Sequence, residues 1–206
     1  MAVGLRICVF CSSSDGVGKV YFDAATELGL EIAGRGHSLV FGGGKIGLMG
    51  AVARAVHQGG GKVMGVMPSK MQEWQVGYDQ ADDMILTENM HDRKAIMEQN
   101  ADGFIALPGG IGTFEELLEI ITLKQLHYHV KPIVILNIGG YYDPLLQLMD
   151  SAVSGKFMKP ETTNLYTVCA SPMEALDHIE GYVPPTVVPK FFVDLLLENE
   201  RDAALE

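Results

Sequence analysis

Short apolar runs alternate along this chain with longer segments in which apolar residues recur at helical spacing. The runs are rich in β-branched and aromatic residues, which predicts strands at 5–11, 38–42, 62–67, 84–87, 103–107, 132–137 and 165–169. The intervening segments predict helices at 18–35, 46–58, 90–100, 113–127, 141–154 and 172–180. Strands that alternate with helices are typical of βαβ units, so we expect an α/β fold in which helices cover both faces of a mainly parallel sheet. Ligands of such sheets bind at the carboxyl ends of the strands.

The length and composition fit one main domain with a short appendage. A chain of 206 residues with 48% apolar residues can bury one sizeable core. After Gly181, three prolines interrupt a polar stretch that precedes the amphipathic run from Phe191 to Leu196. We predict a main domain at 1–183 and a C-terminal linker and helix at 184–206, and we favour a helix packed on its own domain over a dimer arm.

The charge of the chain limits its partners. A net charge of −11 and an isoelectric point near 4.9 oppose non-specific binding to nucleic acid or to an anionic membrane surface. No apolar run approaches the roughly 18 residues of a membrane helix, and the run from Leu5 to Cys11 is too short for a secretory signal. We expect a cytoplasmic protein without a nucleic-acid or membrane partner, whose anionic substrate needs a local positive pocket.

Cysteine and histidine give no support for a metal site. The chain has only three cysteines, and Cys8 and Cys11 share one predicted strand but point to opposite faces. His91, His127 and His129 lack carboxylate or thiolate partners at metal-ligand spacing, which favours surface or helix-end positions. We therefore expect neither a metal nor a cofactor.

The stretch from Leu107 to Glu116, LPGGIGTFEE, joins a predicted strand to a helix through a glycine-rich turn. The amides at the start of that helix and the positive end of its dipole favour a bound phosphate. Thr113 and Glu116 also have the spacing of a capping box, in which the glutamate only satisfies backbone amides. Two adjacent glutamates exceed what a cap requires, and a carboxylate beside an anion site is suited to activating water. Glu116 points about 100° away from the arc that Glu115 and Thr122 share, so the two glutamates can have different roles.

A second glycine cluster, Gly42 to Gly47, follows another predicted strand and has the spacing G-x-G-x-x-G. A dinucleotide site also needs a carboxylate about 20 residues later, where the chain has MGVMP at 64–68, so binding of NAD has little support. The cluster is either a second loop that approaches a phosphate or a tight turn. Likewise Ser12, Ser13 and Ser14, after the first strand, are either hydrogen-bond donors to a ligand or a cap of the next helix.

The segment from Met90 to Met97, MHDRKAIM, opens another predicted helix. Arg93 and Lys94 lie on the same helical face as these two methionines. Basic groups bracketed by apolar residues indicate cationic heads near a cleft, where arginine binds a phosphate or polarises a sugar hydroxyl.

The pattern M-H-x-R-K-x-x-M at 90–97, followed by P-G-G-x-G-T-x-x-E at 108–116, resembles the "lonely guy" family of cytokinin-activating phosphoribohydrolases. Members of that family are often labelled lysine decarboxylase-like. The resemblance includes Gly42 to Gly50 and GYYDPLL at 140–146, and it extends over roughly residues 5 to 183. It implies a Rossmann-like, doubly wound homodimer that hydrolyses the N-glycosidic bond of an adenosine 5′-monophosphate, N6-modified or plain, to a free base and ribose 5-phosphate.

The resemblance also implies the residues of the site. Arg93 and Glu116 fall on the catalytic positions. The candidate substrate-binding residues, from the resemblance and from the glycine and serine loops, are Ser12, Gly43, Gly44, Gln75, Lys94, Gly109, Gly110, Ile111, Gly112, Thr113, Phe114, Glu115 and Thr122. Gln75 stands where the family usually has a glutamate, although Glu73 is close by, and this departure bears on substrate choice.

A mechanism follows from the charge that the reaction develops. Departure of a base leaves positive charge on the sugar, so we assign Glu116 to stabilising an oxocarbenium-like transition state and to orienting or deprotonating water. The phosphate is expected on the amides of 109–113 with help from the loop 42–47, and Arg93 is expected to hold the ribose or base in register.

Two other functions are disfavoured. Decarboxylation of lysine by pyridoxal phosphate needs a Schiff-base lysine with an acidic partner for the ring nitrogen, and we expect no lysine in a pocket of that kind. The non-enzymatic alternative is a nucleotide or molybdenum-cofactor carrier of the same fold. The presence of both Arg93 and Glu116 argues against it.

Overall fold

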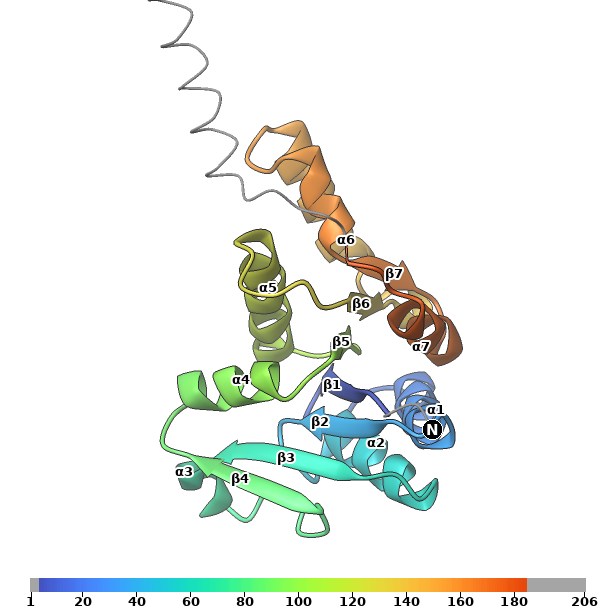
Figure 1. The fold of residues 1–206 in the computed structure, drawn as a ribbon, viewed down its shortest axis with the longest axis vertical. Helices are drawn as coiled ribbons and strands as arrows, with labels where there is room; N and C mark the ends of the chain where they lie inside the picture. Colours follow the sequence, from blue (N-terminus) through green and yellow to red (C-terminus); the bar gives the residue numbers. More distant parts are fainter. Residues whose placement is uncertain (1–3, 185–206) are drawn as a thin grey trace, which may run out of the picture.

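A seven-stranded parallel sheet forms the centre of the computed structural model, which describes residues 4–184 (Figure 1). Its spatial order is β4-β3-β2-β1-β5-β6-β7, and every neighbouring pair is parallel. The strands are β1 (Arg6–Phe10), β2 (Ser38–Phe41), β3 (Val63–Pro68), β4 (Asp83–Thr87), β5 (Gly103–Ala106), β6 (Ile133–Leu136) and β7 (Thr167–Cys169). The strand order therefore reverses between β1 and β5, which is the kind of place where α/β sheets bind ligands.

The longer helices lie in two layers, one on each face of the sheet (Figure 1). One layer holds α1 (Lys19–Gly34), α2 (Gly47–Gln58) and α7 (Pro172–Glu180), and the other holds α4 (Met90–Gln99), α5 (Ile111–Gln125) and α6 (Asp143–Ser154). Successive side chains of β1 point alternately toward the two helix layers, since Ile7 packs in one core cluster and Cys8 in the other. The predicted α/β fold, a Rossmann-like doubly wound sheet with helices on both faces, is confirmed.

The boundaries of the elements agree with prediction to within two residues, and the two-residue differences include the starts of two helices. Helix α5 begins at Ile111 rather than at 113, and α6 begins at Asp143 rather than at 141. The short α3 (Ser69–Gln72) and the 3-10 segments η1 (Ile138–Gly140) and η2 (Pro160–Leu165) were not predicted, because three to six residues give too little periodicity. The predicted linker and helix at 184–206 lie, after residue 184, outside the described residues.

Two predictions about isolated side chains have different outcomes. Cys8 and Cys11 do point to opposite faces, because they belong to different core clusters. His129 follows the end of α5, as predicted, but it is buried rather than on the surface. Its Nδ1 accepts a hydrogen bond from the amide of Lys131, so Nε2 carries the proton and donates to the carbonyl of Ile120 at 3.0 Å. Burial lowers the pKa of His129 to about 4.

Within residues 4–184, no helix has the length and apolar character needed to cross a membrane. Nor does this part of the chain bring three or more His, Cys, Asp or Glu side chains together in an arrangement suited to a metal ion.

Candidate active site

The reversal of strand order brings the loops after β1 and β5 side by side at the carboxyl edge of the sheet. The amide of Ser12 donates to the carbonyl of Pro108 at 3.2 Å and joins the two loops. A cavity of about 400 Å³ opens beside them. The cavity is lined by Cys11, Ser12, Ser13, Ser14, Met49, Met71, Met90, Arg93, Gly110, Ile111, Gly112, Thr113, Glu115 and Glu116.

The start of α5 presents free amides to this cavity. Gly110 is the N-cap and, having no side chain, supplies no capping hydrogen bond. No described residue accepts a hydrogen bond from the amides of Ile111, Gly112 or Thr113. These amides and the positive end of the helix dipole make a site for an anion. Because Thr113 is the third helical residue and not the N-cap, the capping-box interpretation of Thr113 and Glu116 is wrong.

Arg93 and Glu116, which both line the cavity, form a buried ion pair. Nη1 of Arg93 lies 2.6 Å from Oε1 of Glu116, and the two side chains are only 7% and 10% exposed. Nε of Arg93 also donates to the carbonyl of Val66 in β3 at 3.1 Å. Arg93 reaches this place because α4, capped by Asn89, lies in the same layer as α5. The two residues predicted to be catalytic are therefore in contact.

Gly42 makes room for this arginine. A Cβ atom built at Gly42 would lie 2.1 Å from Nη2 of Arg93, so any other residue would displace the guanidinium. Within the glycine cluster, Gly43 and Gly44 were predicted as substrate-binding residues, and no role was predicted for Gly42. The glycine cluster itself was the sequence signal that pointed to this loop. The contact between Gly42 and Arg93 depends on α4, which is distant in sequence.

Burial raises the pKa of Glu116, and the charge and hydrogen bond of Arg93 lower it. The burial effect is the larger, so the pKa of this carboxyl lies above its ordinary value of 4.5. A carboxylate so placed can take or hold a proton closer to neutral pH than an exposed glutamate does.

Lys94 contacts the other carboxylates of α5. Its Nζ pairs with Glu115 and lies 2.9 Å from Oε2 of Glu119. Although burial lowers the pKa of Lys94, its hydrogen bonds with these carboxylates raise it above the usual value. Glu115 and Glu116 thus have different partners, as helical geometry predicts. Lys94 and Thr122 do not line the cavity, and the hydroxyl of Thr122 donates to the carbonyl of Leu118 at 2.7 Å.

The amides that begin α2 are occupied by the chain itself. The amide of Gly47 donates to Oδ1 of Asp15 at 2.8 Å, and the amides of Leu48 and Met49 donate to the carbonyl of Ser12. Helix α2 therefore lacks the free amides that α5 offers. This contact favours the tight-turn interpretation of the loop 42–47 over a second phosphate loop.

Gly43 and Gly44 lie outside the cavity lining. The carbonyl of Gly43 accepts from the amide of Tyr78 at 2.8 Å, and Gly44 forms an antiparallel bridge with Gly77. With φ at 77°, Gly43 adopts a left-handed conformation that suits glycine. Both residues tie their loop to the segment after α3.

The three serines after β1 line the cavity and do not cap α1. The N-cap of α1 is Gly18, with no side-chain hydrogen bond, so the capping interpretation is wrong. Oγ of Ser12 accepts from the amide of Ser14 at 3.0 Å, and Oγ of Ser14 accepts from the amide of Gly16 at 3.2 Å. These turns hold the serines at the edge of the cavity.

Gln75 and Glu73 are exposed in the segment after α3, and neither lines the cavity. Gln75 has a positive φ of 56°, which is uncommon for a residue other than glycine. Met71 of the same segment does reach the cavity. The binding role of Gln75 stays a prediction.

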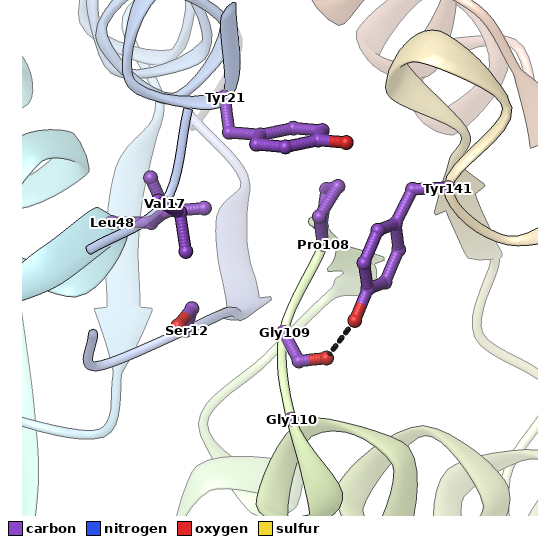
Figure 2. A pocket seen from close by; sticks show the side chains of 8 residues that line it. All are labelled: Ser12, Val17, Tyr21, Leu48, Pro108, Gly109, Gly110 and Tyr141. Carbon is purple, nitrogen blue, oxygen red and sulfur yellow. Dashed lines mark hydrogen bonds between the residues drawn. The ribbon is translucent and has the colours of Figure 1, made fainter. Parts of the chain in front are cut away.

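A second, smaller cavity of about 240 Å³ lies beside the turn 108–110 (Figure 2). It shares Ser12 and Gly110 with the larger cavity. Its other lining residues, Val17, Tyr21, Leu48, Pro108, Gly109 and Tyr141, are mostly apolar. Tyr21 and Tyr141 were missed as site residues, although Tyr141 belongs to the GYYDPLL segment of the family pattern.

Two lysines line cavities away from this site, and neither forms an ion pair with a carboxylate of residues 4–184: Lys131 lines a hollow of about 310 Å³, and Lys124 lines another. Lys124 lines a separate hollow of about 240 Å³, with Glu161 also in the lining. It is 13 residues beyond Ile111 on the same helix, a distance of about 20 Å at 1.5 Å per residue. Burial lowers the pKa of Lys124 to about 8, and no carboxylate of residues 4–184 pairs with it.

Comparison with known proteins identifies relatives across most of the chain. A family model described as "possible lysine decarboxylase" matches residues 49–179. A probable cytokinin riboside 5′-monophosphate phosphoribohydrolase from Oryza sativa subsp. japonica is 46% identical over 179 residues, which cover 87% of this chain and 73% of the relative. A cytokinin riboside 5′-monophosphate phosphoribohydrolase from Arabidopsis thaliana is 42% identical over 198 residues, which cover 96% and 92%.

Solved structures share the fold at lower identity. The molybdenum cofactor binding protein from Rippkaea orientalis superposes with a TM-score of 0.68 at 24% identity, covering 87% of this chain and 98% of the other. The molybdenum cofactor carrier protein from Chlamydomonas reinhardtii superposes with a TM-score of 0.66 at 22% identity, covering 86% and 96%. At these identities the likeness concerns the fold alone. The sequence relatives are closer, and the chain belongs to the possible lysine decarboxylase family, together with plant proteins named cytokinin riboside 5′-monophosphate phosphoribohydrolases.

Proposed function

We propose that this protein hydrolyses the N-glycosidic bond of adenosine 5′-monophosphates, N6-modified or plain, and releases a free base and ribose 5-phosphate. The names of the relatives that are 42% and 46% identical to this chain support that reaction. The observation that carries the proposal is the buried pair of Arg93 and Glu116 in the same cavity as the free amides of α5. The cavity thus combines a site for a phosphate with a carboxylate suited to a developing cation.

The phosphate binds at the start of α5. The amides of Ile111, Gly112 and Thr113 donate to its oxygens, and the helix dipole favours its charge. This local site overcomes the net charge of −11, which would otherwise repel an anionic substrate. The phosphate contacts fix the ribose in position, so the free energy of binding the phosphate helps to stabilise the transition state at the reacting carbon.

Glu116 acts on the sugar one turn further along the helix. As the bond from C1′ to the base nitrogen breaks, its electron pair stays with the base and C1′ becomes positively charged. The carboxylate of Glu116 stabilises that charge and orients the water whose oxygen bonds to C1′. The water gives up a proton, and the departing base gains one. Arg93 holds the carboxylate in place and favours its ionised form.

The reaction is not a decarboxylation of lysine, despite the description of the family model. A Schiff-base lysine needs a lowered pKa to act as a nucleophile. Lys94, which follows Arg93 on α4, has a raised pKa and is paired with Glu115 and Glu119. Its amine is therefore held in the charged, non-nucleophilic form.

We also propose that the protein acts in the cytoplasm as a homodimer. Support for the dimer comes from Ile111, Leu118 and Leu126, which recur seven and eight residues apart along α5 and its end and are all exposed. Leu148 on α6 is exposed as well. Because Ile111 also lines the cavity, a partner on this face would border the site.

Base release by a Glu116→Gln variant tests the proposal. Purified protein is incubated separately with AMP and with isopentenyladenosine 5′-monophosphate, and the free base is measured by chromatography. We expect the variant to bind nucleotide and to lose at least about 100-fold in turnover, since the amide cannot stabilise the cation as a carboxylate does. A Glu119→Gln variant, altered outside the cavity, is the matched control and is expected to retain most of its turnover.

Each outcome has a distinct meaning. The ratio of the two wild-type rates shows whether plain or prenylated adenine is preferred. Unchanged turnover in Glu116→Gln would remove Glu116 from the chemistry. Tight binding of nucleotide with no release of base by the wild-type protein over hours would favour a carrier instead of an enzyme.

A further inference from the structure

Three successive carbonyl groups in the turn before α5 are held by other parts of the chain. The hydroxyl of Tyr142 donates to the carbonyl of Leu107 at 2.7 Å, and the amide of Ser12 donates to that of Pro108 at 3.2 Å. The hydroxyl of Tyr141 donates to the carbonyl of Gly109 (Figure 2). The carbonyl groups of the turn that leads into the anion site are therefore fixed in orientation.

Fixing a carbonyl also fixes the amide of the same peptide group. All described peptide bonds are trans, and in a planar trans peptide the C=O and N–H bonds point in opposite directions. The hydrogen bond from Tyr141 to Gly109 thus directs the N–H of Gly110 away from Tyr141. No described residue accepts a hydrogen bond from that amide, and Gly110 lines the larger cavity.

The ring of Tyr141 is held in place independently of any ligand. It packs edge-on to Tyr21 and to Tyr142, with ring centroids 5.9 and 5.1 Å apart, and it stacks on Phe114 at 6.4 Å. Phe114 belongs to the first turn of α5. The hydroxyl of Tyr141 is therefore presented to Gly109 from a packed aromatic cluster, which makes it a preorganised donor.

We propose that Tyr141 is a positioning residue for the phosphate site: through the carbonyl of Gly109 it aims the amide of Gly110 at the anion bound at the start of α5. Tyr141 acts through this peptide group and does not touch the substrate. The inference rests on the proposed function for the identity of the anion, a nucleoside monophosphate. Its physical content, a weaker anion site without the hydroxyl, is independent of the reaction.

A pair of tyrosine variants separates positioning from support of the fold. Tyr141→Phe keeps the aromatic packing and removes the hydroxyl. Tyr142→Phe removes an equivalent hydrogen bond to the same turn, but the peptide that follows Leu107 ends in the nitrogen of Pro108, which has no N–H to aim. Tyr142→Phe is thus matched in chemistry and place while leaving the orientation of Gly110 unchanged.

Binding and kinetics are measured for both variants. Calorimetric titration with ribose 5-phosphate and with inorganic phosphate, and thermal unfolding, are compared with the KM and kcat for AMP. We expect Tyr141→Phe to weaken both anions and raise KM by about tenfold, the effect of one hydrogen bond to a charged group, with kcat within about threefold of wild type. Tyr142→Phe is expected to unfold at a lower temperature and to bind both anions as the wild-type protein does.

The outcomes keep this inference distinct from the proposed function. Wild-type affinity for both anions in Tyr141→Phe would overturn it, and so would an equal loss of affinity in Tyr142→Phe. If the wild-type protein binds ribose 5-phosphate but releases no base from any nucleotide, the proposed function fails while the titrations still decide the role of Tyr141. Absence of anion binding to the wild-type protein would overturn both.

Discussion

Glu115 and Glu116 show how far the surroundings of a residue decide its chemistry. Both are glutamates on α5, but Glu115 is exposed and paired with Lys94, whereas Glu116 is buried and paired with Arg93. Burial favours the neutral form of Glu116 and the guanidinium favours the charged form, so the protonation of this one carboxyl depends on a balance between them. That balance predicts a pH dependence.

The acid limb of the pH profile should report Glu116. Turnover needs the carboxylate, so kcat/KM rises with pH through the pKa of Glu116, and that limb should lie above pH 4.5 because burial raises the pKa. Arg93 lowers this pKa, so Arg93→Gln should move the limb to higher pH as well as reduce turnover. The profile of kcat/KM against pH is the measurement.

Lys19→Gln is the control for that experiment. Lys19 pairs with Asp23 on the surface of α1, so its loss should leave the limb unchanged. A limb that stays in place in Arg93→Gln, or one that moves equally in Lys19→Gln, would contradict the assignment to Glu116.

At this scale the sequence predicted Arg93 and Glu116 as catalytic candidates but did not predict their contact. Both lie in motifs that resemble a family pattern, and the helical period placed Glu116 apart from Glu115. The contact needs α4 and α5 to be neighbours, and the importance of Gly42 needs Arg93 to lie against it. Such long-range contacts carry no local sequence signal.

At the scale of elements, the glycine-rich turns that lead into α2 and α5 look alike in sequence but differ in their hydrogen bonds. The sequence indicated an anion site at the start of α5 and left the turn before α2 open between a phosphate loop and a tight turn. The first amides of α2 are bound by Asp15 and by the carbonyl of Ser12, whereas those of α5 are free of described partners. The difference could not be predicted, because the group that occupies α2 comes from the loop after β1 and reaches it only in the folded sheet.

Asp15 should therefore act as a cap of α2. Asp15→Ala removes the acceptor for the amide of Gly47 and is expected to lower the free energy of unfolding by about 1 kcal/mol. Binding of ribose 5-phosphate at α5 should stay near the wild-type value. Chemical denaturation and calorimetric titration measure the two quantities.

The matched variant Asp23→Ala loses only an exposed pair with Lys19 and is expected to change stability by no more than about 0.5 kcal/mol. If Asp15→Ala left stability unchanged but abolished ribose 5-phosphate binding, the start of α2 would have to be a ligand site after all.

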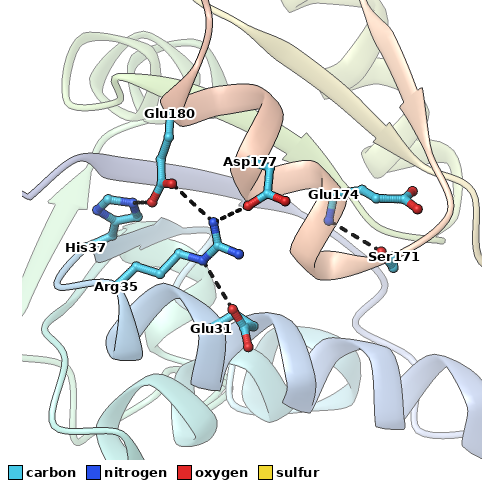
Figure 3. A network of polar contacts seen from close by, with 7 residues as sticks. All are labelled: Glu31, Arg35, His37, Ser171, Glu174, Asp177 and Glu180. Carbon is cyan, nitrogen blue, oxygen red and sulfur yellow. Dashed lines mark hydrogen bonds and ion pairs between the residues drawn. The ribbon is translucent and has the colours of Figure 1, made fainter.

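At the scale of the whole molecule, the candidate site and the main ion-pair network lie at opposite ends of the strands. The network lies near the start of β2: Nη1 of Arg35 is 2.6 Å from Asp177 and 3.1 Å from Glu180, and Nε2 of His37 is 2.8 Å from Glu180 (Figure 3). It joins α1 to α7, the first helix to the last described one. The loops after β1 and β5 lie at the carboxyl ends of the strands, away from this network.

The alternation of strands and helices was enough to predict the fold class, but not the order β4-β3-β2-β1-β5-β6-β7. That order decides which two loops meet, because β5 returns across the sheet to pair with β1 after α4. The sequence therefore predicted the candidate site only as a set of motifs, because the contacts between those motifs depend on a crossover that local periodicity does not encode.

The outer side of α5 should be an interface between two copies of the chain. The exposed apolar side chains Ile111, Leu118 and Leu126 form a stripe that would be costly to leave in water, so the wild-type protein is expected to have a mass close to twice 22.3 kDa by sedimentation. Leu118→Glu places a charge in the stripe and should give monomers. Val20→Glu alters another exposed apolar position, on α1 in the other helix layer, and should stay dimeric. A dimer that survives Leu118→Glu but dissociates in Val20→Glu would place the interface on the opposite face. Because Ile111 also lines the cavity, base release should fall with the loss of the dimer in Leu118→Glu and persist in Val20→Glu.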